Sequence, residues 1–141
     1  MNENVIAKAE KIIADKVGRM SEGFCALALI DDKSYPTAST VSISKADGIK
    51  WLTFCVSANE NKAKRVAGCN RASVCINSPN YNITLVGTAE IITDPKVKKE
   101  MWYAGCEHHW AGPDDPEYAV LRFTTERYSL WIGMEGGEGN L

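Results

Sequence analysis

A basic residue at the start of a predicted helix is the feature of this sequence that most directly suggests chemistry. Lys62 follows a strand-like run that ends at Val56, and apolar residues recur at helical spacing over 60–68. A cation in the first turn of a helix opposes the helix dipole by roughly 0.3–1 kcal/mol, whereas an anion there is stabilised. The sequence is therefore consistent with an anion site beside Lys62, and equally with a solvated lysine on an ordinary helix start.

Short polar side chains separate this strand from the helix. Ser57, Asn59 and Asn61 are residue types that satisfy the unpaired N–H groups of a first helical turn. We therefore expect one of them to cap the helix.

A loop at residues 106–116 carries the densest set of reactive side chains. It contains Cys106, His108, His109 and Trp110. Adjacent histidines lack the spacing of a closed zinc site, so we predict no metal. Either histidine is a candidate proton donor because imidazole titrates near neutrality. Trp110 and the later Trp131 are candidates for covering a flat ligand, or for packing in a core or interface.

The elements that position these groups are mostly strands. Apolar and β-branched runs predict strands at 24–30, 37–44, 49–56, 72–77 and 82–92, with one or two more within 118–132. Helical spacing predicts a helix over 3–19 that Gly18 ends. Asp94 and Pro95 predict the start of a third helix that runs to about Ala104.

Two glycines refine the expected sheet. Asp47-Gly48 predicts a hairpin that pairs strand 37–44 with strand 49–56. Such pairing would place Ser39 and Thr40 near Cys55, leaving room for a flat ligand or for a packed helix. Gly87, inside a strand, predicts a bulge where the sheet bends around a small barrel.

Composition limits the protein class. The 141 residues suit one domain, 1–141, with a flexible Gly-rich tail at 133–141. The net charge of −2 and the dispersed basic residues do not favour a nucleic-acid partner. Five cysteines without a C-x-x-C pair argue against a disulfide framework. With no apolar signal core and no membrane-length stretch, we expect a cytoplasmic protein without a membrane partner.

The order of helix, three strands, short helix, two strands, helix and closing strands predicts a mainly β fold with helices. From Phe24 to Trp131, the chain resembles the pyridoxamine 5′-phosphate oxidase-like FMN-binding split-barrel family, in its general-stress-protein branch. The matching features are the Pro36-led strand, the Asp47-Gly48 hairpin, the strand ending at Val56, the Lys62 helix start, the Ser73-Val74 strand, the Gly87 strand followed by Asp94, and the late Trp131 strand. The expected fold is a small antiparallel split β-barrel with an N-terminal helix and two further helices.

The resemblance implies an FMN whose phosphate is held by Lys62, Ser57 and Asn61. The residues it implies for the rest of the flavin are Ser39, Thr40, Val41, Cys55, Val56, Asn82, Trp110 and Trp131. It also implies a homodimer with two flavin sites at the subunit interface. The implied activity is that of a flavin-dependent oxidoreductase on an unknown small-molecule redox substrate.

Departures from the family pattern leave rival functions open. Val56 cannot donate a side-chain hydrogen bond, and a Glu60 carboxylate that points inward repels a phosphate. The sequence lacks the extended basic C-terminal segment with which true pyridoxamine 5′-phosphate oxidases hold their substrate, so we do not expect that activity. The rivals are a non-catalytic flavin-binding or stress-response module, and the same barrel binding a deazaflavin or heme. Heme requires an axial ligand, for which His108 and His109 are candidates.

Overall fold

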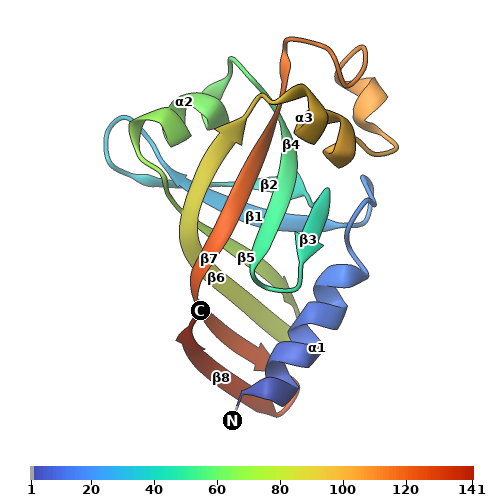
Figure 1. Ribbon diagram of the computed structural model, residues 1–141. Coiled ribbons are helices and arrows are strands. Elements are labelled where there is room, and N and C mark those ends of the chain that lie inside the picture. The colour runs from blue at the N-terminus through green and yellow to red at the C-terminus, as the bar shows by residue number, and fades with distance from the viewer. Residues whose placement is uncertain (1) are drawn as a thin grey trace.

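Eight strands form one curled antiparallel sheet in the computed structural model, which describes residues 2–141 (Figure 1). The strands are β1 (Phe24–Ile30), β2 (Pro36–Ser42), β3 (Lys45–Asp47), β4 (Trp51–Ser57), β5 (Arg71–Ser78), β6 (Tyr81–Ile92), β7 (Tyr118–Ile132) and β8 (Glu135–Asn140). Their order is β2-β1-β5-β6-β7-β4-β3. β4 pairs with the first half of β7, and β8 pairs with the second half. The predicted split β-barrel is confirmed.

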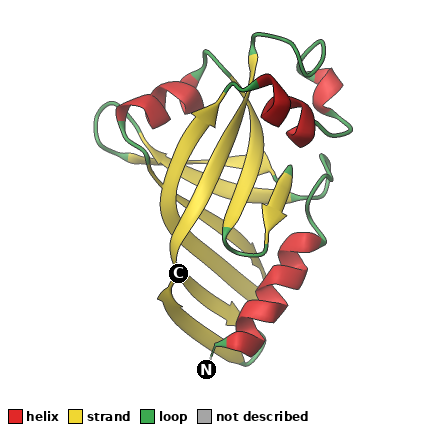
Figure 2. Cartoon of the chain, viewed as in Figure 1, coloured by secondary structure: helices red, strands yellow, loops and turns green. Residues whose placement is uncertain are grey.

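The helices lie at the two ends of the sheet. They are α1 (Glu3–Ala14), α2 (Asn61–Gly68) and α3 (Pro95–Met101), and a 3-10 turn, η1, covers Cys106–His108. Figure 2 shows α2, α3 and η1 grouped at one end, while α1 lies towards the other. α1 buries one apolar stripe, Val5, Ala9 and Ile13. It ends earlier than predicted, and residues 15–18 form turns.

The predicted hairpin exists, but it joins different strands. Gly48 turns the chain between β3 and β4, and Ala46 pairs with Leu52. β2 pairs instead with β1, so that Thr40 lies opposite Ala26. Direct pairing of 37–44 with 49–56 was therefore wrong. The reason is that the chain stays beside β1 as far as Ile43, whose N–H donates to Gly23 O at 3.1 Å, and reaches β4 only at Ser44, whose N–H donates to Thr53 O at 2.8 Å.

The Gly-rich tail was predicted to be flexible, but it is a strand in the structure. It forms β8, which pairs with β7 from Arg127 to Ile132. The glycines allow β8 to lie close to its neighbours: a Cβ at Gly139 would stand 2.7 Å from the hydroxyl of Tyr128. The small residues that suggested flexibility are thus required by close packing.

The strand at 24–30 is buried on one face only, where both faces were expected. Leu27 and Leu29 belong to the main core, whereas Ala26 and Ala28 are half-buried on the opposite face. Cross-strand pairing continues this second face through small residues. We call it the outer face; it consists of Phe24, Ala26, Ala28, Thr40, Ser73, Cys75, Asn82, Thr84 and Trp131. Within residues 2–141, no helix has both the length and the apolar character needed to cross a membrane.

Candidate functional site

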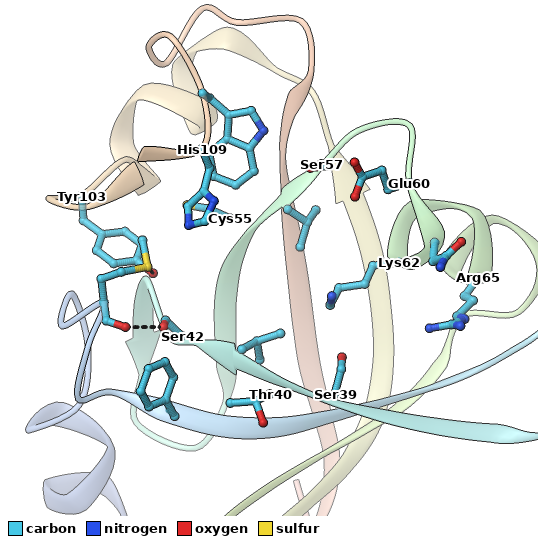
Figure 3. Close-up of a pocket in the computed structure, with 16 residues that line it drawn as sticks. Ser39, Thr40, Ser42, Cys55, Ser57, Glu60, Lys62, Arg65, Tyr103 and His109 are labelled. Atoms are coloured by element: carbon cyan, nitrogen blue, oxygen red, sulfur yellow. Dashed lines mark hydrogen bonds between the residues drawn. The ribbon is translucent and has the colours of Figure 1, made fainter. Parts of the chain in front are cut away.

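A cavity of about 540 Å³ opens at the end of the sheet where α2 and α3 lie (Figure 3). Its walls come from β2, the end of β4, the start of α2, and the segment that follows α3. The lining residues are Met20, Phe24, Ser39, Thr40, Val41, Ser42, Cys55, Val56, Ser57, Glu60, Asn61, Lys62, Arg65, Tyr103, His109 and Trp110. Its volume suits a ligand the size of a cofactor.

The N-terminus of α2 borders this cavity without a side-chain cap. Glu60 occupies the N-cap position, and its side chain accepts no hydrogen bond from the helix. The predicted capping by Ser57, Asn59 or Asn61 was wrong; Asn59 instead donates to Glu117 Oε2 at 3.2 Å. The N–H groups of the first turn therefore stay available to an anion.

Two cations project from α2 toward the cavity. Figure 3 shows Lys62 extending into the cavity, with Arg65 beside it. The two residues are three positions apart and so share one face of the helix. The sequence analysis did not predict Arg65 as a site residue, although its spacing of three from Lys62 was a usable signal. Glu60 is exposed and contributes the one carboxylate among the lining residues.

The sheet supplies a smooth wall. Ser39, Thr40 and Val41 come from β2, and Cys55 and Val56 come from β4. These two strands are not hydrogen-bonded neighbours, yet the curl of the sheet brings both to the cavity. The predicted grouping therefore arises from barrel closure rather than from a hairpin.

Aromatic and imidazole side chains form the opposite wall. Trp110 lies 5.1 Å from Tyr118 between ring centroids, and His109 precedes it in the loop. Asp115 fixes this loop by accepting the N–H groups of Ala111 and Glu117, each at 2.9 Å. These hydrogen bonds lower the pKa of the Asp115 carboxyl. Trp110 and His109 are therefore held in place over the cavity.

A family profile described as pyridoxamine 5′-phosphate oxidase matches residues 13–132. The chain belongs to the pyridoxamine 5′-phosphate oxidase family. The family predicted from the sequence is thus confirmed. No curated protein matches the chain.

Solved structures share the fold of this family member at low sequence identity. A protein from Clostridium acetobutylicum related to general stress protein 26 is 22% identical, with a TM-score of 0.84 and coverage of 100% of this chain and 97% of that one. A pyridoxamine 5′-phosphate oxidase-related, FMN-binding protein from Nostoc punctiforme is 14% identical, with a TM-score of 0.71 and coverage of 99% and 96%. A heme-binding protein from Mycobacterium smegmatis is 20% identical, with a TM-score of 0.72 and coverage of 96% and 57%.

Two residues that the family resemblance implied do not line the cavity. Asn82 and Trp131 pair with each other on the outer face. Asn82 accepts a hydrogen bond from Cys75 Sγ at 3.3 Å and donates one to Thr84 Oγ1 at 2.9 Å. Trp131 is 48% exposed. Within one chain, these two residues are therefore separate from the candidate site.

For several other lining residues, no local pattern in the sequence indicated a place in the cavity. Met20 and Ser42 meet because the Ser42 hydroxyl donates to Met20 O at 2.9 Å. Tyr103 follows α3 and contacts Met20 through its hydroxyl, 3.8 Å from the sulfur. These contacts join parts of the chain that are distant in sequence. Among residues 2–141, no group of three or more His, Cys, Asp or Glu side chains is placed to hold a metal ion.

Proposed function

We propose that this chain binds FMN in the cavity and works as a flavin-dependent oxidoreductase on a small molecule. The observation that carries the proposal is the uncapped start of α2, with Lys62 and Arg65 directed into a cavity that has a smooth sheet wall. Family membership and the FMN-binding relative in Nostoc support it.

The residues at the α2 end fit a phosphate. Lys62 and Arg65 bring two positive charges, and Ser57 and Asn61 bring side-chain donors. The open N–H groups of the first turn add further donors. One carboxylate, Glu60, opposes them, so the lining keeps an excess of one positive charge. The phosphate of FMN would be bound here.

The remaining walls fit a flat ring. Val41 and Val56 offer apolar contact without bulk, and Trp110 offers an aromatic surface opposite them. FMN would supply hydride or single-electron transfer, while the protein orients the ring and limits its contact with water. His109 is the proton donor that we assign on the loop side, because it lines the cavity whereas His108 does not.

The absorption spectrum of the purified protein tests this cofactor. We expect added FMN to remain bound through desalting, at one FMN per chain, with a structured and shifted visible band. Heme is the second candidate, because His109 faces the cavity and a relative of the same fold is named a heme-binding protein. A sharp Soret band after adding heme, with no FMN retained, would overturn the flavin proposal.

We also propose that two chains pack through the outer face and complete the site. Thr40 and Phe24 belong both to this face and to the cavity lining, so a partner packed there borders the cavity. The centre of the face has only small side chains, Ala26, Ala28 and Ser73, which allow two sheets to approach closely. Asn82 and Trp131 would then reach the flavin site of the partner subunit.

A charged side chain at the centre of the outer face should break this dimer. Ser73 is half-buried and pairs with Ala28 and Val86, so Ser73→Arg places an unpaired guanidinium in the proposed interface. We expect sedimentation velocity to show a dimer for the wild type and a monomer for the variant at micromolar concentration. Ala67→Arg, which adds the same guanidinium at an exposed position on α2, is the control. A monomeric wild type that binds FMN fully would refute the shared site.

A further inference from the structure

One end of the cavity has no role in the proposed FMN site. Figure 3 shows Tyr103 and Ser42 at this end, and Lys62, which we assign to the phosphate, at the other. The lining residues that meet at the Tyr103 end are Met20, Phe24, Ser42 and Tyr103. The cavity therefore has a second group of side chains, apart from those that face the phosphate.

Short contacts hold the Tyr103 end in shape. Ser42 pairs with Phe24 across β1 and β2, and its hydroxyl donates to Met20 O at 2.9 Å. Met20 also packs against the segment that follows α3, because a Cβ at Gly105 would stand 2.8 Å from the Cβ of Met20. The walls of this end are therefore fixed by the protein's own contacts.

The hydroxyl of Tyr103 is hydrogen-bonded to a weak acceptor. It donates to Met20 Sδ at 3.8 Å, and a thioether sulfur accepts hydrogen bonds poorly. Burial raises the pKa of this phenol, so the hydroxyl keeps its proton at neutral pH. A carbonyl oxygen of a ligand would accept a shorter and stronger hydrogen bond than the sulfur does. Tyr103 is therefore placed to donate to a ligand in the cavity.

The charges of the lining indicate what this ligand is. Glu60, Lys62 and Arg65 are ionised side chains of the lining, and Figure 3 shows all three at the end opposite Tyr103. A charged group bound beside Tyr103 would lie away from these partners, and burying an unpaired charge is costly. The ligand of the Tyr103 end is therefore neutral. The aromatic ring of Phe24 and the thioether of Met20 favour a flat, apolar body.

We propose that the Tyr103 end binds the substrate, and that the substrate is a neutral quinone whose carbonyl oxygen accepts a hydrogen bond from Tyr103. This inference rests on the proposed FMN site, because reduced FMN is the reductant. The quinone takes a hydride, which is two electrons and one proton, from reduced FMN and a second proton from His109. An N–H bond breaks in each donor, two O–H bonds form, and the hydroquinone leaves. FMN is then oxidised, and His109 regains its proton from water.

Stopped-flow oxidation of the reduced protein tests the substrate. FMN-loaded protein is reduced with a stoichiometric amount of dithionite without oxygen and mixed with duroquinone, whose fully methylated ring does not add to cysteines. We expect the oxidised flavin band to return at a rate that saturates with duroquinone concentration. Tyr103→Phe should raise the half-saturating concentration roughly 3–10-fold, the effect of one lost hydrogen bond. Tyr35→Phe, at an exposed position between β1 and β2, is the matched control and should not change it.

A second oxidant and the flavin affinity separate substrate binding from effects on FMN. Ferricyanide takes single electrons and needs no hydrogen bond from Tyr103, so it should oxidise reduced Tyr103→Phe at the wild-type rate. The variant should also bind riboflavin as tightly as the wild type. A matching loss of riboflavin affinity would show that Tyr103 donates to the flavin ring, and would overturn the substrate site. A rate that rises linearly with duroquinone and is unchanged in Tyr103→Phe would also overturn it.

Equilibrium dialysis of the protein without FMN distinguishes this inference from the cofactor assignment. We expect duroquinone to bind, and Tyr103→Phe to weaken its binding by the same factor as in the stopped-flow experiment. If FMN fails to bind but this result is obtained, the cofactor proposal fails and the quinone site stands without its reductant. If FMN binds and duroquinone binds neither form of the protein, the quinone inference is overturned and the FMN site stands. Circular dichroism of each variant confirms that the fold is kept.

Discussion

Replacing Lys62 with alanine should weaken FMN binding by about 1.5–3 kcal/mol, or roughly 10–150-fold in Kd. The lysine extends into the cavity at the uncapped start of α2, where a phosphate would lie. Alanine is the best helix former, so the variant should fold normally. Titration with FMN and with riboflavin measures the effect, because riboflavin lacks the phosphate. The variant should lose most of the preference for FMN over riboflavin.

A neighbouring lysine provides the matched control. Lys64 is exposed on the same helix and lines a second groove, between α2 and the turn at Asp31 and Asp32, rather than the cavity. Lys64→Ala should therefore change the affinity for FMN by no more than about twofold. An equal loss of FMN and riboflavin binding in Lys62→Ala would show that the lysine acts on the cavity as a whole. The phosphate would then have to be assigned to another part of the wall.

Features that depend on neighbouring residues were the easiest to predict from the sequence. Asp94 caps α3 as predicted, accepting the Lys96 N–H at 2.8 Å, and Pro95 is the first helical residue. Both features depend only on neighbouring residues, so the sequence contains all the information needed. The helix ends at Met101 rather than at Ala104, because nothing nearby determines its last turn.

Pairing between strands was less predictable. Asp47-Gly48 predicts a turn, but it does not say how long the paired segment before the turn will be. The answer depends on Ile43, whose N–H still bonds to Gly23 beside β1, so that pairing with β4 begins only at Ser44. The prediction of a flexible tail was wrong for a similar reason. Its glycines look flexible in isolation, and only the position of Tyr128 shows that β8 must pack closely.

The candidate site was predictable where one element supplied several residues. Ser57, Asn61 and Lys62 follow one another at the end of β4 and the start of α2, and all line the cavity. Arg65 was missed although its helical spacing identifies it. Residues such as Met20 and Tyr103 reach the cavity only through the tertiary fold, so no local pattern could have indicated them.

Replacing Gly87 with alanine should destabilise the barrel by about 3 kcal/mol. The register between β6 and β7 shifts between Val86 and Gly87, as the bulge prediction required. A Cβ at Gly87 would stand 1.9 Å from the carbonyl oxygen of Thr124, a backbone atom that cannot rotate away. Relief requires the two longest strands to separate locally. Thermal unfolding should show a midpoint about 6–12 °C lower.

Gly68→Ala makes the same chemical change where space is free. No atom lies within 4 Å of the position its Cβ would occupy, and the residue ends α2. Alanine there should leave the free energy of unfolding unchanged or raise it by up to about 1 kcal/mol. If Gly87→Ala unfolded at the wild-type temperature, β6 would not approach β7 this closely. The strand curvature that brings β2 and β4 to the cavity would then need another origin, since the bulge bends the sheet between them.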